Sequence, residues 1–230
     1  MMCTKLIWDS EFFGINIATF DFDNKTQKAI KNSEEFDMIV VKNNLENKLS
    51  LPNFKQTFQE TKVVFSKILH LEANLNINNF VFDTDSSSIE TSDLYDLAFE
   101  SGKHSRFKLD SNFQEAKFFE LYQKWVDNSL NKQFADKVFY IKENNLIKGF
   151  VTIKLHSKYA TIGLIGIDNK SQGKGFGSLL IKKSEQYCLQ NNILELQIPT
   201  QKENYLACKF YSKLDYTILN EINYKHLWKI

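Results

Sequence analysis

Apolar residues along the chain follow the spacing of strands in some segments and that of helices in others. In the first 82 residues the spacing is mainly that of strands. Residues 36–42 (FDMIVVK) and 61–69 (TKVVFSKIL) are apolar runs of strand length. Between them, residues 43–49 favour a short helix. A polar, serine-rich stretch follows at residues 83–93, which is typical of a linker. We therefore expect a small α/β domain at residues 1–85 and a second domain at residues 86–230.

The second part mixes helical and strand spacings. Residues 112–130 predict a helix capped by Asn112, whose buried face is formed by Phe113, Ala116, Phe119, Tyr122 (or Leu121), Trp125 and Val126. Residues 138–155 and 159–168 predict three strands of an antiparallel meander. A helix from about 175 to 190, a strand at 193–199, a helix at 203–214 and two short strands at 216–219 and 224–230 complete the prediction. The hairpins exclude a purely parallel sheet, so the expected class is mixed α/β, with a mostly antiparallel sheet flanked by helices.

Composition narrows the possible partners. The net charge is +1, with 43% hydrophobic and 25% charged residues, so bulk charge favours neither a nucleic acid nor a membrane surface. The sequence shows no membrane-spanning run and no secretory signal. Cys3, Cys188 and Cys208 lack the spacing of metal ligands and are expected to be reduced thiols of a cytoplasmic protein, with no metal site.

The stretch SQGKGFGSLL (171–180) holds three of the eight glycines. It fits neither G-x-x-x-x-G-K-[ST] nor G-x-G-x-x-G, but it fits Q/R-x-x-G-x-G/A between a strand and a helix. Small residues let an anion approach the unpaired N–H groups of a helix N-terminus, and Lys174 can add charge. A pyrophosphate site is expected; the alternative is a glycine-rich tight turn. The candidate residues are Gln172, Gly173, Lys174, Gly175, Phe176, Gly177 and Ser178.

Two segments resemble the GNAT N-acyltransferase superfamily. IGLIGIDNKSQGKGFGSLLI is similar to its acyl-CoA-binding core, and ENYLACKFYSKLDY is similar to its N-x-x-A-x-x-F-Y-x-x-L-G-F segment, with Asp215 in place of the glycine. The likeness covers about residues 135–230 and implies a GNAT fold that uses acetyl-CoA.

The same resemblance implies roles for single residues. The backbone of Ile165, Gly166 and Ile167 would lie against pantetheine, where an N–H group could polarise the thioester carbonyl. Asn204 would contact CoA. Tyr211 would be the general acid that protonates the departing thiolate, and the alternative is an aromatic that only packs.

Two further segments, WDSEFFGINIATF (8–20) and ESGKHSRFKLDSNF (100–113), resemble one branch, the dTDP-fucosamine N-acetyltransferases. That likeness implies an N-terminal domain on the acceptor side, a homodimer, and a nucleotide-linked amino sugar as acceptor.

Four acceptor-side candidates follow. Glu60 is the proposed base, with His104 as its rival. Arg106 is the only arginine in the chain; it would bind the diphosphate or the sugar, or else form a structural ion pair. Phe13, beside Trp8 and Phe12, would line a substrate cleft or belong to the core.

Two other functions stay open at this point. A GNAT enzyme could act on another small amine or on a protein N-terminus, and a non-catalytic module could bind acyl-CoA. The resemblance leaves open the sugar, its amine position, the nucleotide and the length of the acyl chain.

Overall fold

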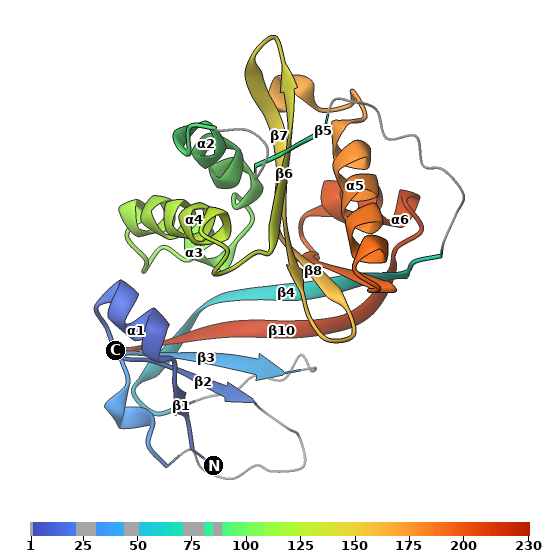
Figure 1. Cartoon of the computed structure of the whole chain (residues 1–230). Helices are drawn as coiled ribbons and strands as arrows, with labels where there is room; N and C mark the ends of the chain where they lie inside the picture. Colours follow the sequence, from blue (N-terminus) through green and yellow to red (C-terminus); the bar gives the residue numbers. More distant parts are fainter. Residues whose placement is uncertain (1, 22–30, 44–50, 71–80, 85–88) are drawn as a thin grey trace.

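The computed structural model describes residues 2–21, 31–43, 51–70, 81–84 and 89–230 (Figure 1). Its strands, in chain order, are β1 (Thr4–Lys5), β2 (Ile17–Asp21), β3 (Met38–Asn43), β4 (Phe54–Ile68), β5 (Val81–Asp83), β6 (Lys137–Glu143), β7 (Leu146–Leu155), β8 (Ala160–Ile167), β9 (Glu195–Gln201) and β10 (Thr217–Lys229). Its helices are α1 (Ile7–Phe13), α2 (Ser92–Ser101), α3 (Arg106–Leu109), α4 (Glu115–Leu130), α5 (Phe176–Gln190) and α6 (Tyr205–Lys213), with 3-10 turns at Ser33–Glu35 and Asn169–Ser171.

The described strands form one sheet in the order β1-β2-β3-β10-β4-β9-β8-β7-β6-β5. Neighbours are antiparallel except in the pairs β2/β3 and β8/β9, which are parallel. The predicted class, a mixed α/β fold with a mostly antiparallel sheet and flanking helices, is confirmed.

Helices cover both faces of the β6–β8 part of the sheet (Figure 1). Side chains alternate along β6: Phe139 and Ile141 pack in the core beneath α5 and α6, while Val138 and Tyr140 pack in the core beneath α2 and α4. Because successive strand residues point to opposite faces, a strand buried on both sides reads as a continuous apolar run. Burial of β6 on both faces therefore explains why residues 138–141 read VFYI, without a polar residue.

β10 differs from the prediction, because the two short strands expected at 216–219 and 224–230 form one strand of 13 residues. The polar residues Asn220, Glu221 and Asn223 interrupt the apolar pattern, but β4 pairs with β10 along this length as well. Bulges between Ile218 and Asn220 and between His226 and Leu227 absorb the irregularity. The two longest strands therefore lie side by side in the middle of the sheet.

The start of α4 and part of its buried face were predicted wrongly. The helix is capped by Gln114, and the Asn112 side chain donates to Asp110 instead of capping. Ala116 and Phe119 are exposed, while Phe118 and Leu121 are buried. Tyr122 and Val126, also expected on the buried face, are buried, so the prediction of this face failed only near the start of the helix.

Neither the domain division nor the helix expected at 43–49 is tested directly. Residues 44–50 and 85–88 lie outside the described part of the chain. Strands from both sides of residue 85 belong to the same sheet, since β4 lies between β10 and β9. The division at residue 85 stays a prediction.

Candidate active site

A cavity of about 810 Å³ brings together residues from both ends of the chain. One end is lined by β8, β9, the glycine-rich turn before α5, and α6. The other end is lined by β4, α1, β10 and the segment around α3. The predicted donor-side and acceptor-side residues therefore meet in one space.

The donor end is a gap where β8 and β9 separate. These parallel strands pair only at Ala160 with Leu196 and at Thr161 with Gln197. Beyond that point, residues 162–167 of β8 and 199–201 of β9 line the cavity. Backbone groups on this edge of Ile165, Gly166 and Ile167 have no ladder partner on β9, so they are available to a ligand.

The strand β8 packs closely against α2 at Gly166, in the part of the strand that faces the gap. A Cβ atom on Gly166 would lie 2.4 Å from the backbone oxygen of Leu97 in α2. Only glycine therefore lets α2 pack this closely against the strand.

The glycine-rich turn lies at the N-terminus of α5. Gly173 and Gly175 have φ values of 80° and 85°, and Gly175 caps the helix without a side-chain hydrogen bond. The first N–H groups of α5 are left for an anion. Gln172, Gly173 and residues 175–178 line the cavity, whereas the Lys174 ammonium lies 2.8 Å from Glu143 and is not among the lining residues.

On α6, Asn204 and Tyr211 both line the cavity. Asn204 is also the N-cap, accepting a hydrogen bond from the Ala207 N–H at 3.3 Å. Tyr211 is 4% exposed and packs against Phe65, Phe210 and Tyr216. Burial raises its pKa, so the phenol is protonated at neutral pH.

The helix α6 ends as the family pattern requires. Asp215 follows at the position where the pattern has glycine, and it has φ of 66°. Aspartate tolerates this left-handed conformation better than most residues, so the turn is kept without the glycine.

Glu60, on β4, is 6% exposed and lines the acceptor end. Its Oε2 atom is buried without a hydrogen-bond partner. Burial raises the pKa of this carboxyl to about 7, and the Arg106 charge opposes that shift. A carboxylate with this pKa can accept a proton near neutral pH.

Arg106, the first residue of α3, lines the same end. Its guanidinium carbon lies 4.7 Å from the Phe107 ring centroid and 5.1 Å from that of Tyr224. Its Nη1 atom is buried without a partner, and within the described residues it forms no ion pair. The expected alternative, a structural ion pair, is therefore not seen among them. His104 also lines the cavity.

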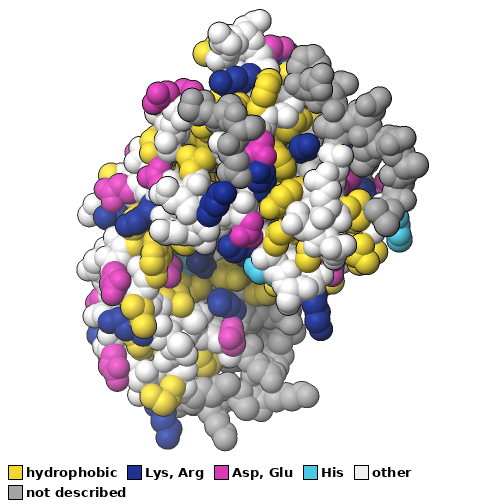
Figure 2. Space-filling model, in the orientation of Figure 1, with side chains coloured by type: hydrophobic (Ala, Val, Ile, Leu, Met, Phe, Trp, Pro, Cys, Tyr) yellow, Lys and Arg dark blue, Asp and Glu magenta, His cyan; other side chains and the backbone are white. Residues whose placement is uncertain are grey.

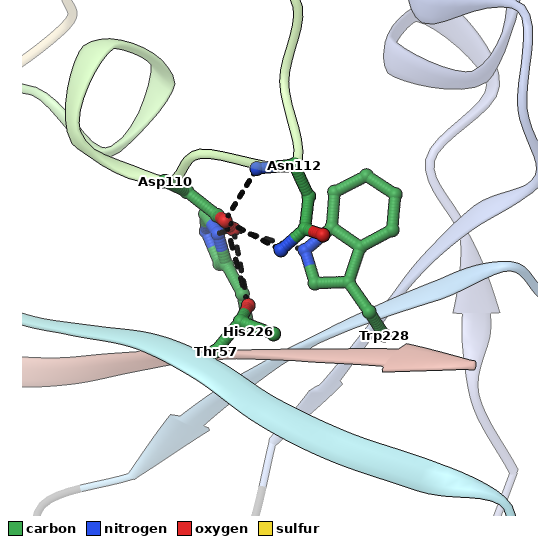
Figure 3. Close-up of polar contacts among 5 residues, drawn as sticks. All are labelled: Thr57, Asp110, Asn112, His226 and Trp228. Carbon is green, nitrogen blue, oxygen red and sulfur yellow. Dashed lines mark hydrogen bonds and ion pairs between the residues drawn. The ribbon is translucent and has the colours of Figure 1, made fainter. Parts of the chain in front are cut away.

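Asp110, which follows α3, is the centre of a buried polar cluster (Figure 3). Its carboxylate accepts hydrogen bonds from His226 Nδ1 at 2.6 Å, Trp228 Nε1 at 2.9 Å and Asn112 Nδ2 at 2.9 Å. These bonds outweigh the desolvation that opposes them and lower the pKa of Asp110 to about 2. Burial lowers the pKa of His226, so a neutral imidazole donates through Nδ1. The cluster ties α3 to β10.

Phe13 is not among the residues that line the cavity. It packs against Phe12, Phe107 and Phe113, whereas Trp8, one turn earlier in α1, does line the cavity. The packing of Phe13 matches the core interpretation.

Several lining residues were missed by the sequence analysis: Asp9, Lys62, Tyr122 and Tyr224. Lys62 could have been found, because it lies two residues after Glu60 in a predicted strand and so shares its face. Tyr224 could not, since only its pairing with Glu60 across β10 and β4 brings it to the site.

Among the described helices, none has the length and apolar character needed to cross a membrane. The described residues also hold no group of three or more His, Cys, Asp or Glu side chains arranged to bind a metal.

Two parallel strands of the mixed sheet separate, and the unpaired N–H groups at the start of α5 lie at the end of the gap. This is the architecture of an acyl-CoA-dependent transferase. The chain belongs to the acetyltransferase (GNAT) family, whose profile it matches over residues 93–216, more than half its length. A putative GNAT acetyltransferase from Novosphingobium aromaticivorans DSM 12444 shares the fold, with a TM-score of 0.57 at 9% identity, over 84% of this chain and 75% of that one.

Two curated proteins from Bacillus subtilis (strain 168) are similar to parts of the chain. Streptothricin acetyltransferase A is 28% identical over 113 residues, 46% of this chain and 65% of that protein. The uncharacterized protein YxbD is 30% identical over 78 residues, 34% of this chain and 48% of that protein. The chain thus spans about half to two thirds of these relatives.

Proposed function

We propose that the protein moves an acetyl group from acetyl-CoA to the amine of a nucleotide-linked amino sugar of the dTDP-4-amino-4,6-dideoxyhexose type. The observation that carries this proposal is the pairing, in one cavity, of donor-side groups with a buried carboxyl whose pKa is about 7. The donor side comprises the open edge of β8, the turn before α5, and Tyr211.

Each of these groups has a separate role in the proposed reaction. The turn residues that line the cavity, 172–173 and 175–178, bind the pyrophosphate of CoA, and the free N–H groups of β8 polarise the thioester carbonyl. Glu60 takes a proton from the ammonium group of the acceptor, and the amine nitrogen then forms a bond to the acetyl carbon. The carbon–sulfur bond breaks, the acylated nitrogen releases its second proton to water to give the neutral amide, and Tyr211 donates its proton to the thiolate. The proton on Glu60 returns to Tyr211 through water, so the enzyme is restored.

The choice of acceptor rests on two segments. Residues 8–20 and 100–113, which resemble the dTDP-fucosamine branch, contribute Trp8, Asp9, His104 and Arg106 to the cavity. An N-terminal part that reaches the acceptor end supports a sugar-nucleotide acceptor over a protein N-terminus.

A second candidate is acetylation of another small-molecule amine. The similarity to streptothricin acetyltransferase A favours it, although that alignment covers 46% of this chain. This candidate needs the same donor side and the same Glu60 and differs only in the acceptor.

A thiol-release assay distinguishes the candidates. Acetyl-CoA is supplied with dTDP- and UDP-linked amino sugars, with streptothricin and with simple diamines, and the product is identified by mass. Release of CoA with a sugar nucleotide, together with an amide product, is expected. Preference for streptothricin would favour the second candidate, and the absence of release with every amine would leave a binding module.

A further inference from the structure

Two basic side chains lie over one ring at the acceptor end, and a third, Lys62, lines the same cavity as Arg106. The Lys42 ammonium of β3 lies 5.8 Å from the Tyr224 ring centroid, and the Arg106 guanidinium lies 5.1 Å from it. Lys62 of β4 is close enough for the Arg106 charge to lower its pKa, second only to the effect of burial. Figure 2 shows Lys and Arg side chains over the middle of the molecule, where β4 and β10 run side by side in Figure 1.

No described residue forms an ion pair with these cations. Among the described residues, Asp9 interacts with Arg106 and Lys42, Glu60 interacts with Lys62 and Arg106, and Asp21 acts on Tyr224. Burial raises the pKa of Glu60 to about 7, which weakens it as a counter-charge. Like charges held together away from water cost free energy unless an anion joins them.

We propose that Lys42, Lys62 and Arg106 form a subsite for a phosphate or diphosphate group of the acceptor. The buried Nη1 of Arg106 has no partner in the described chain, and a guanidinium binds phosphate oxygens through paired hydrogen bonds. Two lysines add point charges from the strands on either side of Tyr224. A cluster of three cations fits a multiply charged phosphate better than a single carboxylate.

The register of the sheet places this subsite relative to Glu60. Lys42 pairs with Tyr224, and Tyr224 pairs with Glu60, so the three side chains stand in a row on one face. Strands lie about 4.8 Å apart, so the phosphate would be roughly 5–10 Å from the Glu60 carboxyl. An acceptor that fits both sites has an amine and a phosphate separated by about one sugar ring. This separation rests on the proposed role of Glu60 as the base, whereas the phosphate subsite does not.

Inorganic pyrophosphate tests the subsite. Because the turn before α5 also favours pyrophosphate, the binding is measured by titration calorimetry on protein saturated with CoA. We expect pyrophosphate to bind, more weakly as salt is added, and to bind about tenfold more weakly in Lys42→Gln and in Lys62→Met. Lys55→Gln is the matched control, because Lys55 is exposed on the same strand as Lys62 but, unlike Lys62, does not line the cavity and, unlike Lys42, does not lie over the Tyr224 ring.

Three results would overturn the proposal. They are no pyrophosphate binding while CoA is bound, equal binding in wild type and both variants, and equal affinity for acetate. A rise in melting temperature when CoA is added shows that a variant is folded. If only one of Lys42→Gln and Lys62→Met is folded, that variant alone is sufficient for the test. A failure of every amine to accept acetyl would overturn the proposed function while leaving this binding measurement intact.

Discussion

Glu60 and Tyr211 are both buried, and burial raises the pKa of both side chains, which suits one to accept a proton and the other to donate one. It raises the pKa of the carboxyl to about 7, which makes Glu60 a useful base near neutrality. It raises the pKa of the phenol, which keeps Tyr211 protonated at neutral pH and so in the form of a proton donor. The thiolate is a weaker base than a phenolate, so the transfer is completed by the Glu60 proton that restores Tyr211.

Glu60→Gln should remove the rise of kcat/KM with pH. A base must be deprotonated to act, so wild-type activity should increase as the pH rises through about 7. The variant should lose about 10²–10⁴-fold in rate, the usual contribution of general base catalysis. The measurement is a pH profile from 5.5 to 9. A variant that keeps the same rising limb would exclude Glu60 as the base and favour His104.

The same variant should be more stable than wild type at high pH. The folded protein holds the Glu60 proton more tightly than the unfolded chain, so stability falls as the pH rises from about 4.5 to about 7. Above that range the penalty is roughly 2–4 kcal/mol, and glutamine removes it. Urea unfolding at pH 4 and pH 8 compares the two proteins. A stability gain of the same size at both pH values would contradict the titration of Glu60.

Tyr211→Phe should lower kcat and leave the affinity for acetyl-CoA nearly unchanged. The substitution removes the proton donor but keeps the ring that packs against Phe65 and Phe210. Steady-state kinetics and calorimetric binding of acetyl-CoA measure the two effects separately. Unchanged kcat would reduce Tyr211 to a packing residue.

At the scale of elements, α3 is one turn long and cannot hold its own position. Its C-terminal neighbour Asp110 bonds to two residues of β10, and the turn's first residue is Arg106. The position of the guanidinium in the cavity therefore depends on a carboxylate four residues away.

Asp110→Asn should destabilise the protein by roughly 3–5 kcal/mol, because an amide N–H would face the buried N–H donors of His226 or Trp228. It should also raise the acceptor KM more than it lowers kcat, since Arg106 moves. Thermal melting and initial rates measure these effects. Glu120→Gln, in an exposed pair with Lys117, is the control and should change little. An unchanged acceptor KM in the folded variant would show that the cluster has no role in positioning Arg106.

Local patterns predicted the elements that local forces determine. The turn at Gly173–Gly177, the meander and α5 were found because their signals lie within a few residues. The start of α4 was missed because Asn112 bonds to Asp110 rather than to the helix. The cluster around Tyr224 was missed because its members are brought together only by pairing between β3, β10 and β4. The sequence therefore indicated the turn at the donor end but not the strand pairing that assembles the acceptor end.

At the scale of the whole molecule, the central strands cross the predicted domain boundary. β4 comes from the first 85 residues, and it pairs with β10 on one side and β9 on the other. Both ends of the cavity therefore depend on a sheet built from the two parts of the chain.

The fragment 86–230 should not fold cooperatively on its own. It lacks β4, so β9 and β10 would lose a common partner in the middle of the sheet. We expect the isolated fragment to show no sharp thermal transition and no CoA-dependent rise in melting temperature. Adding the fragment 1–85 is the control for complementation. A fragment that melts cooperatively and binds CoA alone would establish the two parts as independent folding units.

Arg106 also has a practical consequence. Because it is the only guanidinium among 230 residues and it lines the cavity, an arginine-selective dicarbonyl reagent has one chemical target in this protein. Covalent labelling would report on that single position without any engineered tag. The rate of labelling, followed by mass spectrometry, would measure how well each candidate acceptor shields the cavity.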